Sequence, residues 1–255
     1  MLVLLPPSET KSAPSRGRPL DLHRLSVPEL TATRQTVLTA LTRHCRSDPE
    51  AARETLGLSA GLSSEVDRDA ALDTAPTSRA DKVYSGVLFA ALDLSSLDAG
   101  ARRRAAAWIL ISSGLFGVVR PGDPVPAYRL GGQVRLPGVG PVAAVWREAL
   151  GTVLPTLAGR GPVLDLRSTT YAAFWRPVGT LAHRTLRVRV QQDLGGHRTT
   201  VSHLNKATKG RLLRSLLRSG DTPRSLDGLV GRLGELGWRL ERRTANDVDV
   251  VVTEL

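Results

Sequence analysis

The residues of this 255-residue chain whose types best suit chemistry follow its first apolar segment. Leu2–Leu5 is a continuous apolar run, and the sequence PPSETK comes directly after it, with Ser8, Glu9 and Lys11. A lysine ammonium and a serine hydroxyl are donors to phosphate, and a glutamate is an acid or a base. A loop of polar residues is also what a solvated turn looks like. Two interpretations therefore stay open, an anion site and a plain solvated loop.

A second polar cluster follows a second short apolar segment, VLDL at residues 163–166. We expect a strand there, whose end delivers Asp165, Ser168 and Thr169. In open α/β sheets, ligands bind at the carboxyl ends of strands. Asp165 therefore binds a metal, orients a lysine or serves as a base, or else it caps a helix predicted for residues 170–175. The residue types alone do not decide between these roles.

A third group of candidates lies in SSGLFGVVRPGDPVPAYRL, at residues 112–130. The segment before it, residues 101–111, is rich in helix formers, and we expect it to be helical. Gly114 and Gly117 permit a turn whose amide N–H groups bind an anion, with Arg120 as a bidentate partner. In the other interpretation, the glycines only end the helix and turn the chain. Because three prolines follow Gly117 closely, any second helix must be very short.

Basic residues also gather in NKATKGRLLRSLLR, at residues 205–218, where no acidic residue is present. Apolar residues at helical spacing predict an amphipathic helix with leucines on its buried face. Arg211, Arg214 and Arg218 then share the other face, which is either simply solvated or offset by an anion, because like charges this close repel. We expect the basic residues of this segment, with Lys206, Lys209 and Arg211 among them, to contact phosphate.

The remaining segments supply the elements that must hold these residues in place. Length and hydrophobic content fit one domain over residues 1–255, with an α/β fold of mixed α+β character. The expected helices are 28–46, 48–57, 77–92, 142–154 and 223–235, and the expected hairpins pair 185–191 with 199–204 and 238–242 with 248–252. Residues 128–136 are expected to be extended.

Composition limits the classes of partner. The formal net charge is +11 and the sequence pI is about 11.0, which favours nucleic acid or another polyanion. A coding bias toward arginine explains arginine over lysine, but not the excess of basic over acidic residues. Cys45 is the one cysteine, so an internal disulfide and a cysteine metal cluster are excluded, and we expect no metal. No segment is long and apolar enough to span a membrane, and we expect a cytoplasmic protein.

Five motifs occur in order along the chain: MLVLLPPSETK at the start, VYSGVLFAAL at 83–92, SGLFGVVRPGDPVPAYRL at 113–130, VLDLRSTTYAAF at 163–174 and HLNKATKG at 203–210. Together they resemble the YaaA family of bacterial peroxide stress proteins. The resemblance implies a single α/β domain, with a mixed sheet flanked by helices, a basic cleft and a helix-hairpin-helix-like element. It further implies a cytosolic protein that binds DNA and limits oxidative damage. Tyr128, Arg129 and Tyr171 match positions of the family's segments.

Two functions follow as hypotheses. The first is binding to the duplex DNA backbone in a peroxide stress response, through Gly114, Gly117, Arg120, Tyr128, Arg129, Lys206, Lys209 and Arg211. The second is an enzyme that acts on a phosphate-bearing or nucleotide-linked substrate in the same cleft, with Ser8, Glu9, Lys11, Asp165, Ser168 and Tyr171 as catalytic candidates. No cofactor motif is present. An enzyme should gather its polar residues around one closed pocket with shifted pKa values, whereas a DNA-binding protein should spread them over an open surface.

Overall fold

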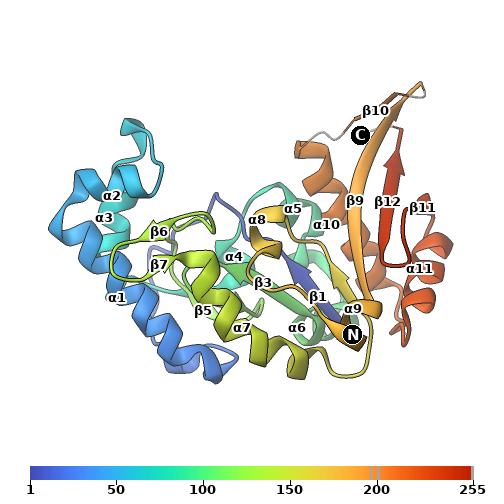
Figure 1. The fold of residues 1–255 in the computed structure, drawn as a ribbon, viewed down its shortest axis with the longest axis horizontal. Coiled ribbons are helices and arrows are strands. Elements are labelled where there is room, and N and C mark those ends of the chain that lie inside the picture. The colour runs from blue at the N-terminus through green and yellow to red at the C-terminus, as the bar shows by residue number, and fades with distance from the viewer. Residues whose placement is uncertain (196, 200–201, 254–255) are drawn as a thin grey trace.

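The computed structural model describes residues 1–195, 197–199 and 202–253, and it is built around an eight-stranded mixed sheet (Figure 1). The strand order is β11-β12-β9-β8-β1-β3-β4, with β10 paired to β9 outside this path. The five neighbours β12, β9, β8, β1 and β3 run parallel to one another. Three other strands, β4, β10 and β11, are antiparallel to their partners. Helices flank this sheet, so the predicted mixed α/β class is confirmed. The extent of the single domain, residues 1–255, stays a prediction.

The described part of the chain forms the following elements. The strands are β1 Leu2–Leu5, β2 Ser78–Arg79, β3 Ile109–Ser113, β4 Gly117–Val119, β5 Pro124–Val125, β6 Arg135–Leu136, β7 Gly140–Pro141, β8 Val163–Asp165, β9 Thr185–Leu194, β10 His197–Thr199, β11 Leu240–Arg242 and β12 Asp247–Val252. The helices are α1 Thr31–Ser47, α2 Pro49–Thr55, α3 Ser64–Ala70, α4 Ala80–Val83, α5 Val87–Leu92, α6 Ala99–Trp108, α7 Val142–Ala158, α8 Thr169–Ala172, α9 Gly179–His183, α10 Ser202–Arg218 and α11 Leu226–Glu235. Short 3₁₀ turns lie at Leu22–Arg24, Pro28–Leu30, Ala60–Leu62 and Leu94–Ser96.

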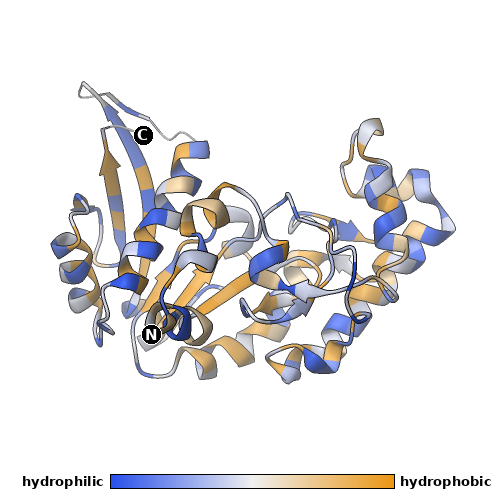
Figure 2. Ribbon diagram, turned by 180° about the vertical axis from the view of Figure 1, so that it is seen from behind, coloured by the Kyte–Doolittle hydropathy of each residue, from blue (hydrophilic) through white to orange (hydrophobic). Residues whose placement is uncertain are grey.

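The central strands are apolar because they are covered on both faces. All residues of β1, β3 and β8 are buried, including the continuous apolar run Leu2–Leu5. Parallel strands in the middle of an α/β sheet have this pattern, since helices lie on both sides of them. Figure 2 shows these strands in the colours of hydrophobic residues, whereas the outer helices carry hydrophilic stretches. Within the described helices, none is long and apolar enough to cross a membrane.

The central segment forms a β-hairpin, which corrects the expected helix-hairpin-helix-like element at this position. The predicted helix ends at Trp108, and Ile109–Ser113 forms β3 instead. The chain then turns back into β4, with Ile111 opposite Val119 and Ser113 opposite Gly117. Branched side chains at Ile109 and Ile111 fit a buried strand better than a helix, and pairing within the sheet core decides the outcome.

One buried arginine attaches the helical lobe α1–α3 to this hairpin. Arg34 on α1 is fully buried, and its guanidinium donates to the carbonyls of Phe116 at 3.1 Å and Val118 at 2.9 Å. It also donates to the carbonyls of Val27 at 3.1 Å and Ser26 at 2.8 Å. Burial lowers the pKa of Arg34 to about 10. These bonds satisfy main-chain oxygens that would otherwise lie buried without donors, so Arg34 fixes the lobe that carries α3 against the sheet.

Other expected elements differ at their ends. The helix expected at 77–92 is divided into β2, α4 and α5, because residues 84–86 leave the helical conformation between α4 and α5. Residues 128–136 form a strand only at Arg135–Leu136. The hairpin after residue 185 and the closing hairpin are confirmed in β9–β10 and β11–β12. The return strand predicted for 199–204 is wrong from residue 202, where α10 begins, and residues 200–201 lie outside the described residues.

Candidate functional site

The two polar clusters predicted from the sequence leave the sheet at the same edge. β1 and β8 are parallel neighbours, and Leu4 lies opposite Asp165 in their register. The loop after β1 carries Ser8, Glu9 and Lys11, and the loop after β8 carries Ser168. Both loops therefore start from the carboxyl ends of adjacent strands, which is the position where α/β sheets bind ligands.

A cavity of about 730 Å³ opens between these loops and two helices. We call it the strand-end cavity; its lining residues are 6–10, 86–89, 166–171, Val188, Arg189, Asn205, Lys206 and Lys209. Its volume lies within the range of about 300–1,000 Å³ that is usual for small-molecule sites. Ser8, Arg167 and Lys209 are buried, whereas Glu9, Ser168 and Lys206 are exposed. The strand-end cavity thus has polar donors in its interior and polar residues at its rim.

Two glycines allow the segments that form the walls of this cavity to pack closely together. A Cβ at Gly86, just before α5, would lie 2.2 Å from the Ser8 hydroxyl oxygen. A Cβ at Gly210 on α10 would lie 2.4 Å from the carbonyl oxygen of Leu88. Real Cβ atoms do not approach other heavy atoms this closely, so only glycine lets the segments meet. The second contact brings α10, with Lys206 and Lys209, onto α5 beside the cavity.

Lys209 is a buried cation in the cavity wall. Its side chain is 7% exposed and its Nζ donates to the carbonyl of Leu166 at 3.1 Å. Burial lowers the pKa of Lys209 to about 8, and the nearby charge of Asp165 opposes this shift. Among the described residues, no carboxylate forms an ion pair with Lys209. An ammonium in this position gains from an anion that enters the cavity.

Asp165 is held by an arginine at the base of the cavity. Arg167 donates from Nε at 2.9 Å and from Nη2 at 2.7 Å to the two carboxylate oxygens, and its backbone N–H also donates to Asp165. The same guanidinium donates to the carbonyls of Tyr171 and Trp175. Asp165 does not cap the following helix, because the N-cap position, directly before α8, is Ser168. The Asp165–Arg167 pair shapes the loop that carries Ser168 and Tyr171.

Lys11 lies beside the cavity in an aromatic environment. Its Nζ donates to the carbonyl of Ser8 at 2.7 Å and lies 4.3 Å from the ring centroid of Tyr128 and 5.4 Å from that of Tyr84. Burial lowers the pKa of Lys11 to about 7, and the positive charge of Arg129 acts in the same direction. The carboxylate of Asp69 acts in the opposite direction. A substantial part of Lys11 is therefore neutral near neutral pH.

Asp69 on α3 completes this environment, although it was not among the site residues expected from the sequence. Its Oδ1 accepts from the backbone N–H of Arg129 at 2.9 Å, while its buried Oδ2 has no partner. Burial raises the pKa of Asp69 to about 8. The Arg129 side chain continues to the loop after β1, where it donates to the carbonyl of Glu9 at 3.2 Å and lies 3.7 Å from the Glu9 carboxylate. No sequence signal marks Asp69, because it sits within an ordinary helical run of charged residues.

Buried hydroxyls surround the far side of the Lys11 environment. The hydroxyls of Tyr84 and Tyr128 lie 3.0 Å apart, and Ser113 Oγ lies 2.7 Å from the Tyr128 hydroxyl. Ser113 Oγ also accepts from the backbone N–H of Phe116 at 2.8 Å. Burial raises the pKa of Tyr84 to about 12 and that of Tyr128 well above its usual value, so both phenols are neutral. Tyr84 is packed in the core, at 1% exposed, and Ser113 was not among the expected site residues.

Three expected binding residues lie away from the cavity. A Cβ at Gly114 would lie 2.3 Å from the Leu130 carbonyl oxygen, and one at Gly117 would lie 2.5 Å from the Trp146 ring. Both glycines are buried in the β3–β4 hairpin, and Gly117 has a φ of +72°. Arg120 donates at 2.9 Å to the carbonyls of Ala106 and Ala107, at the end of α6. Because β4 runs antiparallel to β3, Arg120 lies at the opposite end of the sheet from the strand-end cavity.

Arg211 and Tyr171 take different positions relative to the cavity. Arg211 is exposed on α10 and does not line the cavity, although Lys206 and Lys209 on the same helix do. Tyr171 lines it, and burial raises the pKa of its hydroxyl above the usual value. The structure therefore brings together Ser8, Glu9, Ser168, Tyr171, Lys206 and Lys209 around the cavity, with Lys11, Tyr128, Arg129 and Asp165 directly behind its loops.

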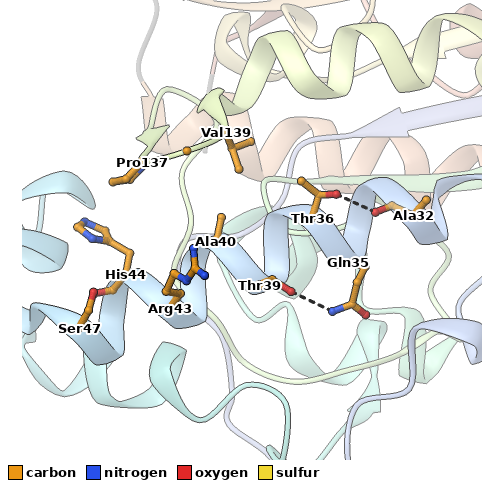
Figure 3. Close-up of a pocket in the computed structure, with 11 residues that line it drawn as sticks. Ala32, Gln35, Thr36, Thr39, Ala40, Arg43, His44, Ser47, Pro137 and Val139 are labelled. Atoms are coloured by element: carbon orange, nitrogen blue, oxygen red, sulfur yellow. Dashed lines mark hydrogen bonds between the residues drawn. The ribbon is translucent and has the colours of Figure 1, made fainter.

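A second cavity, of about 710 Å³, lies between α1 and the turn that joins β6 to β7 (Figure 3). Its titratable lining residues are Arg43 and His44, and His44 Nε2 lies 3.0 Å from the Thr55 hydroxyl. Two further polar residues in the wall bond within α1, Thr36 to the Ala32 carbonyl and Gln35 to the Thr39 hydroxyl (Figure 3). This cavity lacks the buried, unpaired charges found at the sheet edge.

The one cysteine of the chain is buried. Cys45 is 1% exposed, and burial raises the pKa of its thiol to about 12. Because the thiolate is the reactive form, this thiol is poorly suited to reaction with peroxide. In residues 1–195, 197–199 and 202–253, no group of three or more His, Cys, Asp or Glu side chains could hold a metal ion.

Comparison with known proteins gives consistent matches over most of the chain. A family model described as "Peroxide stress protein YaaA" matches residues 1–238. A UPF0246 protein of Streptomyces coelicolor is 52% identical over 241 residues, which cover 94% of this chain and 92% of that protein. A UPF0246 protein of Corynebacterium efficiens is 43% identical, with 86% of each chain covered. An uncharacterized protein of Campylobacter jejuni is 27% identical over 69% of this chain and 72% of its own length.

Proposed function

We propose that this chain acts in the peroxide stress response by binding a phosphate-bearing ligand in the strand-end cavity. The chain belongs to the peroxide stress protein YaaA family. The observation that carries the proposal is Lys209. It is a buried lysine in the cavity wall whose described polar partner is a carbonyl oxygen, at 3.1 Å. A charge held in this way needs an anion to offset the cost of its burial.

The other charges of the cavity favour the same class of ligand. Lys206, Arg167 and Arg189 add three cationic side chains to the lining, and Glu9 is the one acidic lining residue. Arg167 is neutralised by Asp165, and Arg189 lies 3.3 Å from Asp249. Lys206 and Lys209 therefore supply the excess positive charge. The Ser8 hydroxyl adds a neutral donor of the kind that phosphate oxygens accept from.

Phosphate can reach such a cavity from two sources, a phosphorylated small molecule or the backbone of duplex DNA. The volume of about 730 Å³ and the burial of Lys209 favour a ligand of nucleotide size. The net charge of +11 and the exposed Lys206 and Arg211 on α10 support DNA, which was the first hypothesis from the sequence. The shared chemistry is a phosphate group between the loop after β1 and α10.

Binding measurements with two probes test the proposal and separate the sources. Titration calorimetry with inorganic pyrophosphate should show binding that Lys209→Met weakens by about 10- to 100-fold, because a charge-assisted hydrogen bond is lost. Lys82→Ala removes an exposed lysine outside the cavity and serves as the matched control. Failure of pyrophosphate to bind, or equal effects of the two substitutions, would contradict a phosphate site at Lys209.

Duplex DNA is tested in a salt series. If DNA phosphates enter the cavity, Lys206→Ala combined with Lys209→Ala should reduce the slope of log affinity against log salt by up to about two units. Arg120→Ala should leave this slope unchanged, because Arg120 caps α6 at the opposite end of the sheet. Pyrophosphate binding together with an unaltered DNA slope would assign the cavity to a small phosphorylated ligand.

A further inference from the structure

The use of lysine in this chain differs from its use of arginine. The sequence has 31 arginines and four lysines, at positions 11, 82, 206 and 209. Lys206 and Lys209 line the strand-end cavity, and Lys11 follows directly after its lining residues Ser8, Glu9 and Thr10. Arginine supplies positive charge elsewhere but remains protonated in proteins, whereas a buried lysine becomes a neutral amine. Three of the four lysines in this arginine-rich chain therefore lie in the cavity lining or directly after it.

Of the two lysines whose pKa is lowered, Lys11 has the surroundings that a reacting amine needs. Its Nζ donates one hydrogen bond, to the Ser8 carbonyl, and its other neighbours are the ring faces of Tyr84 and Tyr128. The ring faces favour the ammonium form, whereas burial and the charge of Arg129 lower the pKa of Lys11 to about 7. The acidic groups that face Lys11 are Asp69, Glu65 and Glu9, and none of them forms an ion pair with it among the described residues.

We propose that Lys11 is a catalytic residue whose neutral amine adds to the carbonyl carbon of a phosphate-bearing aldehyde or ketone held in the strand-end cavity. This inference rests on the proposed function for the position of the phosphate, which Lys209 and Lys206 bind. The carbonyl end of the ligand then points toward the loop after β1. Lys11 is not itself a lining residue, but its Nζ lies 2.7 Å from the carbonyl oxygen of Ser8, which lines the cavity.

The reaction needs no oxidant, reductant or cofactor. The lone pair of Nζ forms a bond to the carbonyl carbon, and the carbonyl oxygen takes up a proton. That oxygen then leaves as water, which carries away the two hydrogens of the amine and leaves a C=N double bond. Asp69, whose unpartnered Oδ2 is buried and whose pKa burial raises to about 8, is a protonated acid near neutral pH. It can supply the proton to the departing oxygen and recover one from the amine.

Reductive trapping on the wild-type chain tests this proposal directly. The probe is glycolaldehyde phosphate with sodium cyanoborohydride at pH 7, and peptide mass spectrometry measures the adduct at each lysine and at the α-amino group. With a pKa of about 7, Lys11 has about a thousand times more neutral amine than an exposed lysine. We expect Lys11 to be labelled at least about tenfold faster than Lys82, with half of its maximal rate near pH 7.

Two matched variants and one competitor define the site. Lys11→Arg should abolish the dominant adduct, while Lys82→Arg should leave it unchanged. Inorganic pyrophosphate should slow labelling of Lys11, because it competes for the phosphate position. Labelling of the four lysines in proportion to their exposure, or a Lys11 rate that still rises above pH 9, would overturn the proposal.

A second probe separates this proposal from the proposed function. Glycolaldehyde has the same carbonyl group without the phosphate, and it should label Lys11 more slowly than glycolaldehyde phosphate does. If both probes label Lys11 equally fast and pyrophosphate has no effect, the reactive amine is supported and the phosphate site is refuted. If glycolaldehyde phosphate instead labels Lys209 or Lys206 and pyrophosphate competes, the phosphate site is supported and the role of Lys11 is refuted.

Discussion

Replacing Asp165 by asparagine should lower the free energy of unfolding by about 3–5 kcal/mol. The side chains of Asp165 and Arg167 are 6% and 2% exposed, and the guanidinium donates to both carboxylate oxygens, at 2.9 and 2.7 Å. Asparagine has nearly the same shape but has no charge and only one acceptor oxygen. The variant therefore leaves a buried guanidinium without its counter-ion, in a protein of typical total stability of about 5–15 kcal/mol.

An exposed pair on the neighbouring strands provides the control. Arg187 lies opposite Asp165 in the β8–β9 register and pairs with Asp247, and their side chains are 60% and 23% exposed. Asp247→Asn makes the same chemical change but should cost no more than about 1 kcal/mol, because solvent screens the pair. Urea unfolding followed by circular dichroism measures both variants, provided that the slopes against urea agree. Equal losses in the two variants would refute the conclusion that burial makes the Asp165–Arg167 pair important.

Two further substitutions test the geometry of the site. Gly86→Ala should destabilise the protein by about 1–3 kcal/mol and weaken pyrophosphate binding, because the new Cβ would lie 2.2 Å from Ser8 Oγ. Gly151→Ala on α7, where nothing lies within 4 Å, should instead stabilise by about 0.5–1 kcal/mol in the same urea experiment. Burial raises the pKa of Asp69 from 3.8 to about 8. Between about pH 4 and pH 8, the folded state therefore keeps a proton that the unfolded state releases. For this reason Asp69 makes the free energy of unfolding fall as pH rises through that range. Asp69→Asn should remove this fall in a urea series across that range; an unchanged pH dependence would show that Asp69 is ionised in the folded protein.

The candidate site could be predicted in part because its residues follow apolar strands. Ser8 lies three residues after the end of β1 and Asp165 is the last residue of β8, and polar loops after parallel strands meet at one edge of the sheet. Asp69 could not be found in this way. It lies on a short helix of a separate lobe, and it reaches the site only because the backbone of Arg129 passes beside it. Such a contact between residues 60 positions apart leaves no local pattern in the sequence.

The central segment shows the opposite error. Gly114, Gly117 and Arg120 have the residue types of an anion site, but the hairpin buries both glycines against Leu130 and Trp146. Arg120 then follows β4 to the far end of the sheet, where it caps α6. The choice between a phosphate nest and a packed turn depends on what covers the glycines. Leu130 covers Gly114 and Trp146 covers Gly117, and both lie well outside the local sequence of the turn.

The sequence by itself determined the α/β class, the apolar central strands, the polar loops at their ends and the membership of the chain in its family. These features depend on local periodicity and on motifs that are read along the chain. Tertiary structure alone decided which loops share a cavity, which arginines are neutralised and which lysines are buried. The physical reason is that charge burial and pairing depend on neighbours brought together by sheet order and helix packing. Lys11, Asp69 and Lys209 owe their shifted pKa values to that surrounding protein and not to their own segments.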